Sequence, residues 1–142
     1  MERRFEERTV RKALQRGYVD AQRLLASPSQ MQKFLLRLEE KEEVVRTVGE
    51  PLAAVPVLER LLRRYLDGEY TVISAAAMAQ VVSALLYFVS PWDLYPDSVP
   101  GKGYADDAAV LDCCWKLCQP ELEAYLAWER EQLVCRNGSA GA

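Results

Sequence analysis

Apolar residues recur every three to four positions along most of this chain, which is the spacing of one face of an α-helix. The pattern predicts helices at residues 2–26, 28–49, 51–66, 71–89, 105–119 and 120–134. No stretch alternates apolar and polar residues as a half-buried strand does, and the sequence holds no internal repeat and no glycine-rich phosphate loop. We therefore expect an all-α, single-domain bundle of about six helices.

Serine, proline and glycine mark several of the expected helix boundaries. Ser27 precedes Pro28, which is a start signal because serine caps free N–H groups and proline is preset for the first turn. Pro56 lies early enough in the third helix to kink or restart it, and Gly68 closes that helix. Gly17 is a weak point at which the first helix can break.

The longest uncharged stretch runs from residue 70 to residue 92, and its twenty-three residues are enough to cross a bilayer. Its alanines, serines and glutamine make it only mildly apolar. The next helix cannot return through a membrane, because charges such as Asp112 and Lys116 would each cost about 2.5–3.5 kcal/mol at mid-bilayer. We therefore expect residues 71–89 to be the buried central helix of the bundle, with a membrane span as the alternative.

Length and charge narrow the class of protein further. The chain has 142 residues, the size of one domain, and a net charge of −3. Because this balance gives no basic field over the whole surface, we do not expect a nucleic-acid partner. The sequence contains no histidine, which excludes a Ser-His-Asp or Cys-His nucleophile system and removes the commonest zinc ligand.

Four cysteines are present without a CxxC pair, and three of them fall on one expected helix: Cys113, Cys114, Cys118 and Cys135. A thiolate metal site would need Cys135 to fold back from the tail, so we expect free thiols buried as small hydrophobes. The amino terminus is charged where a secretory signal would be apolar. We therefore expect a reducing, cytoplasmic location, with membrane association as the alternative.

The first helix is rich in arginine, a composition that suits an anionic membrane or RNA. Its arginines are Arg3, Arg4, Arg8, Arg11, Arg16 and Arg23. The interleaved acidic residues, which include Glu7 and Asp20, favour instead an ordinary solvated helix face.

The segment from residue 87 to residue 107 joins the uncharged run to the next helix as a corner rich in proline, glycine and aspartate. It contains Pro-Trp-Asp-Leu-Tyr-Pro-Asp at 91–97 and Gly-Tyr-Ala-Asp-Asp at 103–107. This spacing resembles the signature of the YkvA-like family, a bacterial and archaeal domain of unknown function, over residues 60–128. The recurrent residues of the family correspond here to Pro91, Asp93, Pro96, Asp97, Gly103, Asp106 and Asp107.

The resemblance implies no established catalytic role. Some family members are described as membrane-associated, including a RING-type ubiquitin ligase of the endoplasmic reticulum. The resemblance therefore strengthens the membrane alternative.

The aspartates of the corner are the only constellation in the sequence that could carry chemistry: Asp93, Asp97, Asp106 and Asp107. Their carboxylate oxygens suit Mg²⁺ or Ca²⁺, so a metal site and acid–base catalysis are two open alternatives. Such a site would bind weakly, on the order of millimolar, because adjacent helix positions such as 106 and 107 point about 100° apart.

A structural role is the interpretation that we favour for these aspartates. Ser90, Pro91 and Asp93 have the spacing of a capping box, in which Asp93 reaches back to the start of its helix. Asp97 follows Pro96 as in a turn. Residues 106 and 107 begin the next helix, where a carboxylate caps free N–H groups and meets the positive end of the dipole.

Together, these patterns predict the domain organisation and the function. We expect an amino-terminal helical extension (1–55), a YkvA-like core (56–134) and a disordered tail (135–142). The expected function is a non-enzymatic interaction or scaffold module without a cofactor, whose partner is an unknown protein, a second copy of the chain or a membrane surface. The alternative is a Mg²⁺- or Ca²⁺-dependent enzyme that uses the corner aspartates on a phosphate or lipid headgroup.

Overall fold

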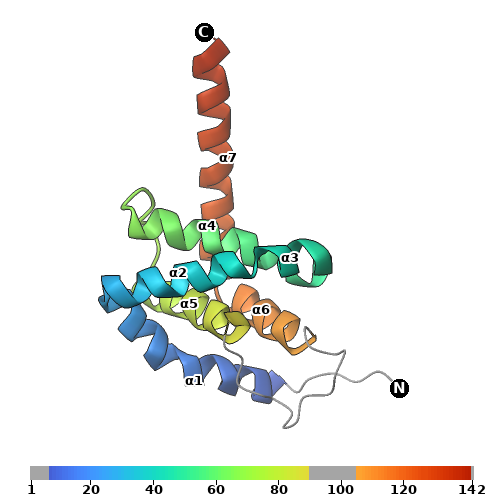
Figure 1. The fold of residues 1–142 in the computed structure, drawn as a ribbon. Helices are drawn as coiled ribbons and strands as arrows, with labels where there is room; N and C mark the ends of the chain where they lie inside the picture. The colour runs from blue at the N-terminus through green and yellow to red at the C-terminus, as the bar shows by residue number, and fades with distance from the viewer. Residues whose placement is uncertain (1–6, 90–104, 142) are drawn as a thin grey trace.

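The computed structural model describes residues 7–89 and 105–141, and the regular structure in these two ranges is helical throughout (Figure 1). The elements are α1 (Glu7–Ala26), α2 (Pro28–Glu40), α3 (Glu42–Val48), the 3-10 turn η1 (Glu50–Leu52), α4 (Ala54–Leu66), α5 (Ala75–Val89), α6 (Ala105–Leu117) and α7 (Gln119–Gly141). The expected all-α bundle is confirmed.

Helix α5 forms the centre of the bundle. Ten of its fifteen residues are buried, and α1, α2, α4 and α6 all pack against it. A helix that is apolar on every side needs cover on every side, and these four helices provide it. The expectation of a central helix at 71–89 is confirmed, although the helix begins at Ala75.

The length of α5 also bears on the membrane alternative. Its fifteen residues rise roughly 22 Å, against about 30 Å for the hydrocarbon core of a bilayer. Within residues 7–89 and 105–141, no helix combines the length and the apolar character that a membrane span needs.

Helix α1 lies across α5 at a point of close approach. Ser83 on α5 is buried, and its Oγ donates a hydrogen bond to the carbonyl oxygen of Leu14 at 2.6 Å. A Cβ atom at Gly17 would lie 2.7 Å from the same Oγ. The sequence marks Gly17 as a point at which the helix can break, but α1 is continuous there, and the missing Cβ lets the two helices approach.

The remaining helix boundaries follow local chemistry. Ser27 caps α2 by accepting a hydrogen bond from the N–H of Gln30, as expected. Pro56 is the third residue of α4, in its first turn, where its missing N–H costs no intrahelical bond. The helix expected at 28–49 is two helices, α2 and α3, which meet at Lys41. Gly68 ends α4 with a φ of 80°.

The two ends of the chain differ in their packing. Helix α1 belongs to the bundle, because it packs on α5 and α6. Helix α7 packs through its first half and then projects from the bundle (Figure 1). Its helical backbone runs to Gly141, into the segment 135–142 for which the sequence predicts a disordered tail. The division of the chain at residue 55 stays a prediction.

Replacing Gly17 with alanine tests the close approach of α1 and α5. In an ordinary helix interior this change stabilises by about 1 kcal/mol. Here the new methyl group displaces the Ser83 hydroxyl from the Leu14 carbonyl, and a buried group left without its hydrogen bond costs about 1–3 kcal/mol. We therefore expect the gain to be cancelled or turned into a net loss of up to about 2 kcal/mol in the free energy of unfolding. Chemical denaturation measures the loss, and Gly17→Ala in a Ser83→Gly background is the control, because that background removes the Oγ. A stabilised Gly17→Ala variant would contradict the contact.

Candidate functional site

The candidate residues of the corner lie mostly outside the described part of the chain. These are Ser90, Pro91, Asp93, Pro96, Asp97 and Gly103. Asp106 and Asp107 fall in the first turn of α6, as the sequence predicts, but their side chains are outside the described set. Their proposed roles as caps or metal ligands therefore stay predictions.

A hollow lies beside the first turns of α6, directly after the corner. It has a volume of about 340 Å³ between α6 and the start of α4. Its floor is apolar and includes Val57, Leu111 and Trp115, and its acidic members are Glu50 and Asp112. Neither carboxylate is buried, so the hollow offers an apolar surface with an acidic edge.

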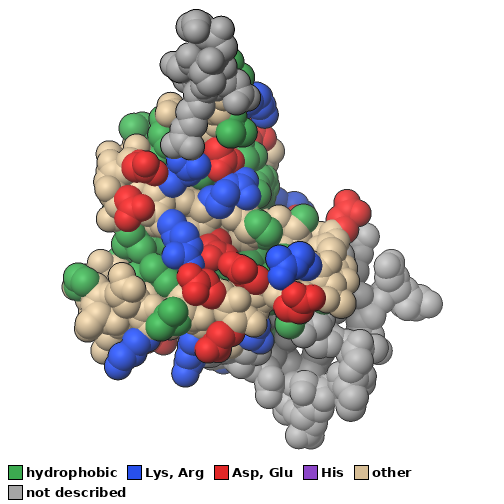
Figure 2. All heavy atoms as spheres, turned by 45° about the horizontal axis from the view of Figure 1, so that its top comes forward, with side chains coloured by type: hydrophobic (Ala, Val, Ile, Leu, Met, Phe, Trp, Pro, Cys, Tyr) green, Lys and Arg blue, Asp and Glu red, His purple; other side chains and the backbone are tan. Residues whose placement is uncertain are grey.

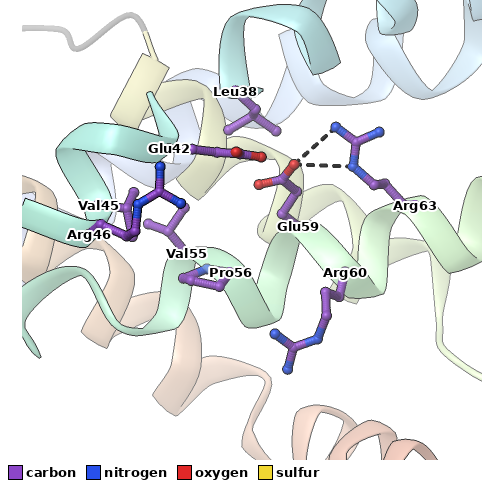
Figure 3. A pocket seen from close by; sticks show the side chains of 9 residues that line it. All are labelled: Leu38, Glu42, Val45, Arg46, Val55, Pro56, Glu59, Arg60 and Arg63. Carbon is purple, nitrogen blue, oxygen red and sulfur yellow. Dashed lines mark hydrogen bonds and ion pairs between the residues drawn. The ribbon is translucent and has the colours of Figure 1, made fainter. Parts of the chain in front are cut away.

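A second hollow lies between α3 and α4 and has a volume of about 290 Å³ (Figure 3). Leu38, Val45 and Val55 are among its apolar residues. Its charged residues are Glu42, Arg46, Glu59, Arg60 and Arg63. An apolar floor with a few charged groups at its edge is typical of a binding surface. Whether this hollow can bind a charged ligand depends on which of its charged groups are already ion-paired.

Most charged groups around this hollow are ion-paired, either with one another or with residues just outside it. Arg63 bonds to Glu59 through Nη2 at 2.9 Å and also reaches Glu39 at 3.2 Å. Arg46 bonds to Glu43 at 2.8 Å. On the face formed by α2, α3 and α4, acidic and basic side chains alternate and do not gather by sign (Figure 2). This face therefore carries no strong field of one sign.

Glu129, a largely enclosed carboxylate, holds α7 to α4. Arg60 donates two hydrogen bonds to Glu129, from Nε to Oε2 at 2.7 Å and from Nη2 to Oε1 at 3.0 Å. Tyr125 donates its hydroxyl to the same Oε2 at 3.0 Å. Arg64 lies 3.9 Å from this oxygen. Glu129 is thus a carboxylate with three donor or cationic neighbours, which is a well-satisfied structural group.

An aromatic cluster continues this α4–α7 link. Tyr70, Tyr125 and Trp128 lie with ring centroids 4.9–5.9 Å apart. The guanidinium of Arg64 sits 5.3 Å from the Trp128 ring and also pairs with Glu69 at 3.5 Å. Because cation, rings and carboxylate share one interface, the cluster fixes the first half of α7.

The pKa shifts in this link follow from its hydrogen bonds. The bond to Glu129 raises the pKa of Arg60, and the bond from Arg60 lowers the pKa of Glu129. Burial and the bond to Glu129 raise the pKa of Tyr125 to about 12. All three groups are thereby kept in their ordinary charge state near neutral pH, which suits a structural link and not proton transfer.

The cysteines of α6 face the central helix. Cys114 and Cys118 are buried, and their thiols point to the carbonyl oxygens of Gln80 at 3.6 Å and Ala77 at 4.0 Å. The hydrogen bond with Cys118, and then burial, raise the pKa of Cys114, so this thiol stays protonated. The expectation of free, buried thiols is confirmed for Cys114 and Cys118, whereas Cys113 is half-buried. Among the described residues, no three potential ligands come together as a metal site.

Sequence reasoning missed the link between α4 and α7. The spacing of Tyr125 and Glu129 by four positions was a usable signal for a shared helix face. The partner Arg60 lies 69 positions earlier, and no local pattern pairs residues at that distance.

Two comparisons with known proteins give a match. Residues 77–111, which run from α5 into α6, match a family described as a protein of unknown function, DUF1232. The uncharacterized membrane protein YkvA of Bacillus subtilis (strain 168) is 38% identical to this chain over 69 residues. The alignment covers 49% of this chain and 65% of that relative. No solved structure matches the chain. The two matches support the resemblance to the YkvA-like family that the sequence predicts.

The raised pKa of Tyr125 predicts a loss of stability in alkaline solution. The folded chain keeps the phenolic proton up to about pH 12, whereas an unfolded tyrosine loses it near pH 10. The stabilisation is therefore complete below about pH 10 and is lost as the pH rises through about 12. Between these values, urea denaturation should show a steeper fall in the free energy of unfolding for the wild-type chain than for Tyr125→Phe. Equal slopes would mean that Tyr125 does not hold its proton in the link.

Proposed function

We propose that this chain is a non-enzymatic helical interaction module that works at a membrane surface. The proposal rests on the hydrogen bonds that Glu129 accepts from Arg60 and Tyr125. These bonds join α4 to α7. An active site holds such groups toward a substrate with pKa values matched to proton transfer. In the α4–α7 link they are bonded to one another, and the link positions a helix.

The helix that this link positions is suited to contact a partner. Beyond Glu129, α7 projects from the bundle and exposes Leu133 and Val134, at 58% and 65% of their full surface. Two neighbouring apolar side chains on a projecting helix are favourable contacts for a groove or helix of another protein. The partner is an unknown protein or a second copy of the chain.

The membrane part of the proposal is supported by the relative from Bacillus subtilis, whose printed name calls it a membrane protein. Helix α5 is enclosed by other helices, so the association we propose is peripheral, through the surface of the bundle. Peripheral contact through charged side chains is weakened by salt, whereas insertion of an apolar span is not.

Cell fractionation tests the proposed function. In cells that express the chain, it should sediment with the membranes and pass into the supernatant after a high-salt wash. An integral membrane protein and a soluble enzyme serve as controls for the two extremes. Recovery only in the first supernatant, or release only by detergent, would contradict peripheral association.

The alternative, a metal-dependent enzyme, requires a metal site in the corner. It needs a tight Mg²⁺ or Ca²⁺ site that includes Asp97, whereas the proposed module needs no metal. A micromolar site in the chelator-treated protein, lost on Asp97→Asn, would favour the enzyme over the module.

A further inference from the structure

Helix α1 separates its residues by burial more sharply than its sequence suggests. Its buried side includes Val10, Leu14, Gly17 and Ala21, which face the bundle. Its exposed positions are Arg11, Lys12, Gln15, Arg16, Val19, Gln22, Arg23 and Ala26. At 100° per residue, these positions fill a continuous arc of about 140°. We name this arc the α1 basic face.

The α1 basic face contains four cationic side chains and no acidic one. Between Val10 and Ala26, the one acidic residue is Asp20, which is half-buried at the edge of the arc and lies 3.8 Å from Arg23. Lys12 and Arg16 make no ion pair within the part of the chain that the structure describes. Asp20 therefore opposes Arg23, whereas Lys12 and Arg16 keep their charge unopposed among the described residues.

We infer that the α1 basic face is the surface through which this chain contacts an anionic lipid bilayer. The inference rests on the proposed function and names the surface that serves it. Each basic residue close to an anionic membrane raises partitioning by about five-fold, so Lys12 and Arg16 together raise it by about 30-fold. Val19, which is 52% exposed, lies in the middle of the arc and adds an apolar contact at the headgroup level.

The net charge of −3 does not oppose this contact. Helix α1 carries five basic and two acidic residues, so the excess of acidic residues lies elsewhere in the chain. Fields from exposed charges fade over about 8 Å at physiological salt, and acidic groups on the far side of the bundle lie beyond that range. The electrostatic attraction to the bilayer therefore depends on the charge of the α1 basic face and not on the net charge of the chain.

The inference also orients the molecule. The apolar side of α1 is held by α5 and α6, so α1 rests on the headgroups without leaving the bundle. Helix α7 projects from the opposite side of the bundle (Figure 1). With α1 on the bilayer, α7 points away from it and remains open to a protein partner.

Vesicle flotation tests the inference with matched variants. The full chain is mixed with vesicles of phosphatidylcholine alone or with added phosphatidylglycerol, at low and at high salt. The test variant is Lys12→Ala with Arg16→Ala, and the control is Lys116→Ala with Arg130→Ala, which removes two exposed charges from α6 and α7. Thermal unfolding confirms that both variants are folded.

We expect binding only to the anionic vesicles, with a partition coefficient about 30-fold lower for the Lys12/Arg16 variant and changed less than about three-fold for the control. Failure of the wild-type chain to bind anionic vesicles would overturn the membrane-surface function together with the inference. Wild-type binding that the Lys12/Arg16 variant retains would overturn the inference alone. Equal binding to both kinds of vesicle, or binding to single-stranded RNA in place of vesicles, would also overturn it.

Discussion

Helix α5 is apolar and buried over most of its length, and the other helices are arranged so that they cover its apolar surface. Its small residues, among them Ala77, Ala79 and Ala84, let neighbouring backbones approach closely. The buried hydroxyl of Ser83 is satisfied by the backbone of α1 at the point where Gly17 leaves room, whereas the buried Oε1 of Gln80 on the same helix has no hydrogen-bond partner among the described residues. Helix α1 can cover α5 only if the two helices lie close together. If α1 lay further away, a void would remain between them and the Ser83 hydroxyl would lose its hydrogen bond.

Helix α5 forms the apolar interior, and charged residues on the surrounding helices form two further features, the α4–α7 link and the α1 basic face. On one side, Arg60 and Glu129 join α4 to α7 and hold the first half of a helix whose second half leaves the bundle. On the other side, α1 turns Lys12, Arg16 and their neighbours outward on a face without acidic residues. The link and the basic face lie at opposite ends of the molecule (Figure 1), which is the arrangement that the proposed module requires.

The sequence predicts those parts of the molecule that depend on local signals. Periodicity locates the helices, and twenty-three uncharged residues locate the core helix. The low helix propensity of Gly17 marks a point at which α1 can break, whereas its tertiary contact with Ser83 needs the missing Cβ. Arg60 and Glu129 pair across 69 positions, and the basic face emerges only when burial sorts the residues of α1. Asp93 and Asp97 lie outside the described residues, so their roles stay predictions.

Hydrogen exchange with and without anionic vesicles tests the central claim that α5 is a core helix in a module that meets membranes from outside. Amides buried in a packed core open only with the global free energy of unfolding. The account predicts that α5 is the most protected segment of the free chain and keeps the same protection on vesicles. Fast exchange of α5 in the free chain, or a large change in its protection when vesicles are added, would contradict the claim.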